Sequence, residues 1–285
     1  MLQRLPRASF RLILASLILT SMLLLCCAFA AAATLQFGTR SLNIPEPQGF
    51  TPLSSVSPRY MQLAQAYLPA SNRLVEAYAT PADAKALSEG RGSQLVRYLQ
   101  LQAPRAAEGT PLSEQEFAEA SKAMEEQFES TMRNSKDLID DAAKKGNAEI
   151  KRITSTDPNV ALSGIEYLGA YRREPWGLFF TIKSGVSAGD GAKQTLVCSG
   201  ALVMINYQLL FMYSYAQYHD SADREWVEQA TSAWADAARA ANPNDPAVAA
   251  KTKHGFFGGS LLRNTLIGAI IGGIVGLFAK IFKKS

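Results

Sequence analysis

Cysteine and histidine are scarce in this sequence, and their scarcity excludes two kinds of site. The 285 residues include three cysteines and two histidines, His219 and His254. Two of the cysteines fall in an apolar N-terminal run, so Cys198 is alone in the remainder and has no partner for an internal disulfide. No spacing of cysteine and histidine matches a zinc site. We therefore expect a domain held together by its apolar core, without a metal.

Charge is also sparse, because only 19% of the residues are Asp, Glu, Lys or Arg and the net charge is +4. Arg4, Arg7 and Arg11 lie in the first 33 residues, and without them the net charge is +1. A chain this close to neutral has no global field that attracts nucleic acid. The sequence contains no phosphate-binding loop, dinucleotide fingerprint or calcium loop. These absences predict no cofactor and no nucleic-acid partner.

The first 33 residues have the composition of a signal peptide. Three arginines form a basic start, residues 12–27 are uncharged, and the alanine-rich residues 28–33 supply small side chains for cleavage. The apolar run is long, so retention as an uncleaved N-terminal anchor is the alternative. Either outcome exports the chain that follows, residues 34–250.

A second apolar segment lies near the C-terminus. Residues 261–281 provide about the 20 residues that a spanning helix needs, provided that Arg263 and Lys280 extend toward the two interfaces. This organisation predicts a linker at 251–260, a transmembrane helix at 261–281 and a cytoplasmic tail at 282–285. Because the signal peptide exports the middle, we expect an inner-membrane protein with its main domain in the periplasm.

Glycines recur along the predicted membrane helix. Gly268, Gly272 and Gly276 are spaced four residues apart, so they line one face and permit close approach of a second helix. This spacing favours a homo-oligomeric membrane assembly. The alternative is that glycine is simply frequent in membrane helices.

The middle of the chain predicts one α+β domain. Pro58 follows Ser57 at the start of a helix that reaches about residue 68. Ser113 and Glu116 form a capping box for a long helix that extends to about Gly146. Asp220 or Ser221 begins a final helix, with a buried stripe predicted at Trp226, Ala230, Trp234, Ala237 and Ala241.

Strand-like runs lie between and around these helices, since they are rich in β-branched and aromatic residues. Residues 34–56 contain three prolines and predict an extended lead-in with at most one short strand. Asn206-Tyr207 is the natural turn of a hairpin. Neighbouring strands joined by short turns predict a mainly antiparallel sheet covered by helices. The predicted strands are residues 73–79, 94–103, 148–154, 165–171, 177–186, 194–205 and 208–218.

This order of elements resembles the PsbP-like α/β sandwich. The hairpin run LVCSGALVMINYQLLFMYSY, the helix run WADAARAAN and the glycine-rich segment that follows are also similar to a group of bacterial membrane-anchored envelope proteins. The run from Pro69 to Leu74 fits the same group. The resemblance implies an α+β domain tethered in the envelope and implies no catalytic residues.

Two weak signals point to chemistry or binding. Gly185-Val186-Ser187-Ala188-Gly189 matches G-x-S-x-G, and with His219 it suggests an envelope serine hydrolase, although a strand rather than a helix is predicted to follow Ser187. Arg172, Arg173 and Trp176 form a charged turn with an aromatic expected to be exposed, which suits a ligand or partner contact. Cys198 lies among apolar strand residues and is expected to be a small buried hydrophobe.

Without a catalytic constellation, we expect a non-enzymatic domain that binds another envelope protein. The serine hydrolase with Ser187 and His219 is one alternative, and the oligomeric assembly through the glycine face is another.

Overall fold

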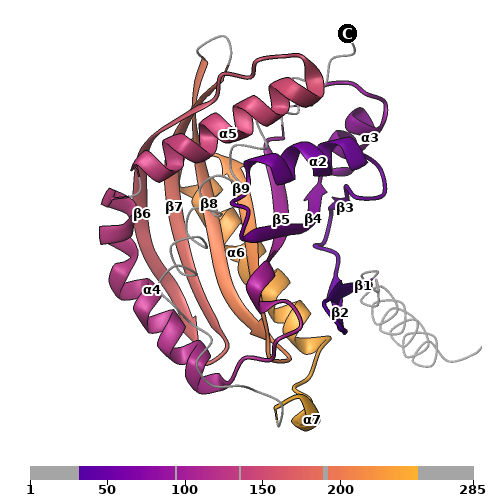
Figure 1. Cartoon of the computed structure of the whole chain (residues 1–285), viewed down its shortest axis with the longest axis vertical. Coiled ribbons are helices and arrows are strands. Elements are labelled where there is room, and N and C mark those ends of the chain that lie inside the picture. Colours follow the sequence, from indigo (N-terminus) through magenta and orange to yellow (C-terminus); the bar gives the residue numbers. More distant parts are fainter. Residues whose placement is uncertain (1–31, 94, 135, 189–191, 250–285) are drawn as a thin grey trace, which may run out of the picture. The chain divides into compact units, whose positions relative to one another are not determined.

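The computed structural model describes residues 32–249, apart from residues 94, 135 and 189–191 (Figure 1). Within these residues no helix has the length and apolarity to cross a bilayer. The predicted signal peptide at 1–33 lies almost entirely outside the described residues. The predicted membrane helix at 261–281, its Gly268, Gly272 and Gly276, and the tail at 282–285 also lie outside them, so these assignments stay predictions.

A seven-stranded sheet forms the centre of the fold, and each strand is antiparallel to its neighbours. A separate two-stranded hairpin precedes it in the chain. The predicted α+β class with a mainly antiparallel sheet is therefore confirmed. In spatial order the strands of the sheet are β3 (Thr51–Pro52), β4 (Asn72–Ala79), β5 (Arg97–Pro104), β9 (Gln208–Gln217), β8 (Ala192–Ile205), β7 (Gly177–Ala188) and β6 (Ala161–Glu174), and the hairpin is β1 (Ala32–Phe37) with β2 (Arg40–Pro45).

The turn between β8 and β9 sets the register of the central strands. Asn206 and Tyr207 have φ angles of 44° and 63°, the left-handed pair that a two-residue hairpin turn requires. Ile205 pairs with Gln208 directly across the turn. The predicted turn is confirmed, and the register carries both strands' alternating side chains onto fixed faces of the sheet.

Helices lie on both faces of the sheet (Figure 1). We name the faces by their helices: the α2 face, which carries Phe180 and Tyr213, and the α6 face, which carries Phe179 and Met212. On the α6 face, one helix lies against β7, β8 and β9, and also against β2. The helices of the α2 face are α2 (Pro58–Tyr67), α3 (Pro81–Ser88), α4 (Glu114–Asn134) and α5 (Lys136–Thr154); the others are α6 (Ser221–Ala240), the short α7 (Pro246–Ala249) and the 3-10 turn η1 (Arg105–Ala107).

The local signals at the helix starts hold. Pro58 is in the first turn of α2. The Ser113 hydroxyl accepts from the backbone N–H of Glu116 at 3.2 Å, and the Glu116 carboxylate accepts from the N–H of Ser113 at 3.1 Å, which completes the predicted capping box. The Asp220 carboxylate accepts from the N–H of Ala222 at 2.8 Å and caps α6.

The predicted strand at 148–154 is wrong, because these residues form the second half of α5. The predicted single helix from Ser113 to Gly146 is in fact two helices, α4 and α5. Gly146 does not end a helix. A Cβ there would lie 2.2 Å from the ring of Tyr67, so glycine lets α2 pack directly on α5. Ile150, one turn later, is buried at this contact.

Two other predictions near the ends of the domain were wrong. Residues 34–56 hold parts of three strands rather than at most one, since β1 and β2 form a hairpin that buries Phe37, Leu42 and Ile44. The buried stripe of α6 is shifted: Trp234 is buried as predicted, but its neighbours in the core are Val227, Thr231, Ala235 and Ala238. Helix α3, which no prediction included, begins at Thr80, whose hydroxyl accepts from Asp83 N–H.

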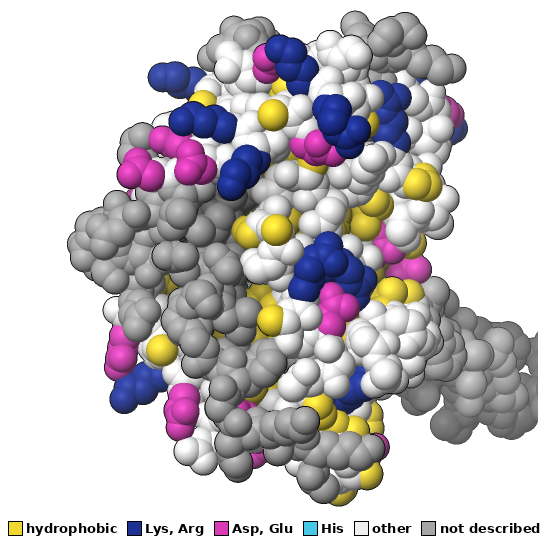
Figure 2. Space-filling model, viewed as in Figure 1, with side chains coloured by type: hydrophobic (Ala, Val, Ile, Leu, Met, Phe, Trp, Pro, Cys, Tyr) yellow, Lys and Arg dark blue, Asp and Glu magenta, His cyan; other side chains and the backbone are white. Residues whose placement is uncertain are grey.

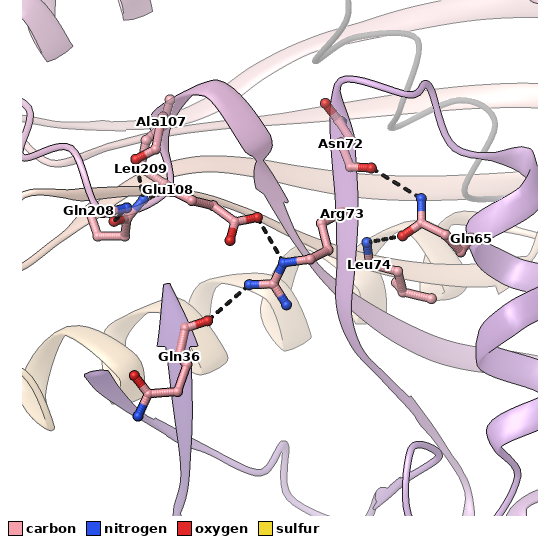
Figure 3. A network of polar contacts seen from close by, with 10 residues as sticks. Gln36, Gln65, Asn72, Arg73, Leu74, Ala107, Glu108, Gln208 and Leu209 are labelled. Carbon is pink, nitrogen blue, oxygen red and sulfur yellow. Dashed lines mark hydrogen bonds and ion pairs between the residues drawn. The ribbon is translucent and has the colours of Figure 1, made fainter. Parts of the chain in front are cut away.

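A polar network joins β4 to its neighbours on both sides (Figure 3). The Arg73 guanidinium donates to the Glu108 carboxylate at 2.7 Å and to the Gln36 carbonyl of β1 at 2.9 Å. From α2, Gln65 donates to the Asn72 carbonyl at 3.1 Å and accepts from the N–H of Leu74 at 2.7 Å. The pairing of β4 with β5 is irregular between Leu74 and Glu76, so this side chain supplies a partner at the irregularity.

Gly200 allows two aromatic rings to meet on the α2 face. It stands between Phe180 and Tyr213 in one row across three strands. A Cβ at this position would lie 2.5 Å from the Phe180 ring and 3.0 Å from the Tyr213 ring. The rings therefore occupy the space that a side chain would need.

Replacing Gly200 with valine tests this close packing. We expect Gly200→Val to lower the free energy of unfolding by about 1–3 kcal/mol, because buried rings must shift. Thr195→Val, at an exposed position of the same strand, serves as the control. Adding Phe180→Leu should recover part of the loss in a double-mutant cycle measured by chemical denaturation. Equal stability of Gly200→Val and wild type would contradict the packing argument.

Candidate functional site

The end of the β6–β7 hairpin carries the predicted contact residues Arg172, Arg173 and Trp176. Arg172 extends toward α6, where its guanidinium donates to both carboxylate oxygens of Asp236 at 2.9 Å. It also donates to Glu174 at 3.0 Å and lies 4.8 Å from the centre of the Phe179 ring. The hydrogen bonds from Asp236 raise the pKa of Arg172 above its ordinary value. This arginine is committed to contacts within the domain.

Trp176 is buried, which corrects the expectation of an exposed aromatic. Only 8% of it is accessible. The guanidinium groups of Arg172 and Arg239 lie 5.5 Å and 4.9 Å from its ring, and Phe179 meets it edge-on at 5.9 Å. Cation–π contacts of this kind stabilise the packing of α6 on the hairpin.

Arg173 extends to the opposite side of the strand. Its guanidinium forms an ion pair with Glu125 of α4, and the hydrogen bonds from Arg173 hold the pKa of Glu125 below its ordinary value. Because successive strand residues point to opposite faces, Arg172 and Arg173 connect one strand to helices on both sides of the sheet. The trio therefore fastens the hairpin between α4 and α6.

A row of buried hydroxyls lies under α6, and the sequence analysis did not identify it. Thr181, Ser199 and Ser214 pair across β7, β8 and β9, and none of the three is exposed. The Thr231 hydroxyl of α6 donates to the Ser214 hydroxyl at 2.9 Å, and the Thr181 hydroxyl donates to the Glu228 carboxylate at 2.7 Å. The signal for this row was the recurrence of a small hydroxyl residue at the same level of three apolar strands.

Tyr171 completes this polar row at its β6 end. Its hydroxyl lies 2.8 Å from the Ser199 hydroxyl and donates to the Glu228 carbonyl at 3.2 Å. Burial raises the pKa of Tyr171 to about 12. The phenol is therefore neutral at physiological pH and acts as a hydrogen-bond donor to the helix.

The geometry around Ser187 is a hairpin. Ser187 pairs with Ala161 on one side and with Lys193 on the other, and Ala188 pairs with Ala192. A strand follows it, so the serine is not presented at a helix N-terminus as a nucleophile elbow requires.

His219 follows β9, and strand β8 separates it from β7. Neighbouring strands are about 4.8 Å apart, so the backbones of β7 and β9 are roughly 10 Å apart. The His219 Nδ1 atom lies 3.0 Å from an Asp223 carboxylate oxygen, and the His219 N–H donates to the same atom at 2.9 Å. Its hydrogen-bonding partner is therefore at the start of α6.

Cys198 is buried, as its apolar neighbours indicated. Burial raises the pKa of its thiol, which keeps it protonated and a poor nucleophile. Among the residues with described positions, no group of His, Cys, Asp and Glu could hold a metal ion. On the surface seen in Figure 2, basic and acidic side chains lie interspersed rather than in one field of a single sign.

Comparisons with known proteins add little. No family model matches the sequence, and no curated protein matches it. Among solved structures, the Ran-binding protein Mog1p of Saccharomyces cerevisiae aligns over 76% of this chain and 97% of that chain, with 8% sequence identity and a TM-score of 0.30. A likeness this weak supports no argument about fold or function.

Removing Arg172 should weaken the attachment of α6 to the β6–β7 hairpin. We expect Arg172→Ala to lower the free energy of unfolding by about 1–2 kcal/mol, because a two-oxygen ion pair and contacts with two aromatic rings are lost together. Arg172→Lys should recover only part of this loss, since ammonium lacks the planar fork. The matched control is Arg173→Ala, whose more exposed pair should matter little. Equal losses for both arginines would contradict these roles.

The hairpin geometry also predicts that Ser187 is not a nucleophile. A fluorophosphonate probe should leave the chain unlabelled in intact membranes at neutral pH. Labelling of wild type that disappears in Ser187→Ala, but persists in the neighbouring Ser184→Ala, would establish the hydrolase instead.

Proposed function

We propose that this chain is an inner-membrane-anchored periplasmic domain that acts, without catalysis, by binding another protein of the cell envelope. The observation that carries the proposal is the position of the folded unit between two apolar segments. The ordered hairpin begins at Ala32, next to the predicted end of the signal peptide at residue 33, and the last described element, α7, ends at Ala249, just before the predicted linker. Export followed by anchoring explains both boundaries.

The chemistry of the domain supports binding over catalysis. Ser187 is in a hairpin, His219 is bonded to Asp223, and burial suppresses the reactivity of Cys198. Arg172 and Arg173, the most conspicuous charged pair, hold helices to the sheet. The polar groups that the sequence offered for chemistry have structural partners in the fold.

The PsbP-like sandwich remains part of this proposal. Helices on both faces of an antiparallel sheet are the layers that such a sandwich requires. The partner we propose is an envelope protein, because a tethered domain needs only local encounter to bind within the same compartment.

The compartment can be tested with single cysteines in spheroplasts. Gln229 is exposed on α6, so Gln229→Cys should react with a membrane-impermeant maleimide added outside. Ser285→Cys, at the predicted cytoplasmic end, should react only after lysis. Both variants carry Cys198, which should stay unlabelled until the protein is denatured.

The opposite pattern would overturn the proposed topology. Labelling of Ser285→Cys in intact spheroplasts, with Gln229→Cys protected until lysis, would place the domain in the cytoplasm. Release of the whole chain from membranes by salt would contradict the anchor.

A further inference from the structure

The α2 face has an apolar middle whose nearest described helices lie at its margins. On this face α4 and α5 lie against β6, while α2 and α3 lie against β4, and β8 and β9 run between these two groups (Figure 1). The side chains of the middle strands are nevertheless at most 2% exposed. They include Leu202 and Met204 of β8 and Leu209, Phe211 and Tyr213 of β9.

These side chains form a continuous apolar surface across the strands. Leu178, Leu202 and Phe211 make one row, and Phe180, Gly200 and Tyr213 make the next. Phe128 of α4 meets Phe180 at 5.0 Å, which covers the β7 side of this surface. An apolar patch of this extent requires a cover when the domain is in water.

The chain leaves the described region beside these strands. The backbone N–H of Asp245 donates to the side-chain carbonyl of Asn206, in the β8–β9 turn, at 3.0 Å. Helix α7 begins at the next residue, Pro246, and ends at Ala249. The remaining 36 residues, 250–285, therefore start at the end of the two strands that carry the apolar surface.

The length and charge of this C-terminal segment match the surface. A helix over 261–281 is roughly 32 Å long, and the 14 residues of β8 extend over roughly 46 Å, so the helix fits along the strand. Residues 250–285 contain six Lys and Arg and no acid, whereas residues 34–249 contain all 25 Asp and Glu against 20 Lys and Arg. Exposed acids at the margin include Glu119, Glu126, Asp137 and Asp141.

We propose that the chain's own residues 255–281 dock on the middle of the α2 face, between α4 and α2, whenever they are not in a bilayer. The same segment then has two exclusive environments, the sheet during transit and the membrane once anchored. The apolar centre of the segment meets the middle strands, and its terminal lysines and arginine approach the acidic margins. This inference rests on the proposed function for the anchored state only; docking on the sheet stands independently.

Photo-crosslinking of the full-length chain tests the proposal without altering its packing. Photo-methionine replaces Met204 on the α2 face and Met212 on the α6 face within the same molecule. In a lipid-free preparation kept soluble with amphipol, Met204 should link to peptides from 255–281, and Met212 should link to α6. Adding vesicles of phosphatidylethanolamine with phosphatidylglycerol should reduce the Met204 links at least tenfold.

Each other outcome has a definite meaning. A mixture of isotopically light and heavy chains distinguishes links within a chain from links between copies; Met204 links only between copies would overturn docking in favour of a dimer. Met204 links restricted to residues 32–249 would also overturn it. Met204 links to 255–281 that persist unchanged with vesicles would support docking while refuting the membrane anchor of the proposed function.

Discussion

The alternation of side chains along β8 and β9 is the constraint on which the rest of the domain depends. The two-residue turn at Asn206 and Tyr207 fixes which residues share a face, and a slip by one residue would exchange Met212 with Tyr213. Both faces of this hairpin are apolar, apart from the hydroxyls of Ser199 and Ser214, so it requires cover on both sides. That requirement explains a layered α+β domain in which α6 occupies one face and several helices share the other.

Elements whose signals are local could be predicted from the sequence. Strands β7, β8 and β9, the cap of α6 and the capping box at Ser113 depend on residues within a few positions of each other. The second half of α5 depends instead on contact with α2, where Gly146 receives the ring of Tyr67 from 79 positions earlier in the chain. A glycine that permits helix packing and a glycine that ends a helix look the same in a sequence, which is why residues 148–154 were assigned to a strand.

The candidate site shows the same division between identity and partners. Arg172, Arg173 and Trp176 were recognisable as unusual residues in a short turn, but Asp236 and Glu125 lie 64 and 48 positions away. Local charge predicted an exposed contact, whereas the distant carboxylates and Arg239 turn the same residues into a buried attachment. The hydroxyl row of Thr181, Ser199 and Ser214 was hidden for a related reason: its pattern exists only after the strands are registered side by side.

An apolar segment that follows an exported domain faces a physical difficulty before it reaches the bilayer, since it must pass through water. Burying each methylene group contributes about 0.8 kcal/mol, so even partial contact with an apolar sheet face stabilises the segment. A bilayer offers fuller burial and wins once it is reached. The glycines at 268, 272 and 276 suit both environments, because a helix face without side chains approaches a flat sheet as closely as it approaches a second helix. A domain whose central strands carry apolar side chains on the face away from α6 can therefore protect its own anchor, and the tether and the fold become parts of one design.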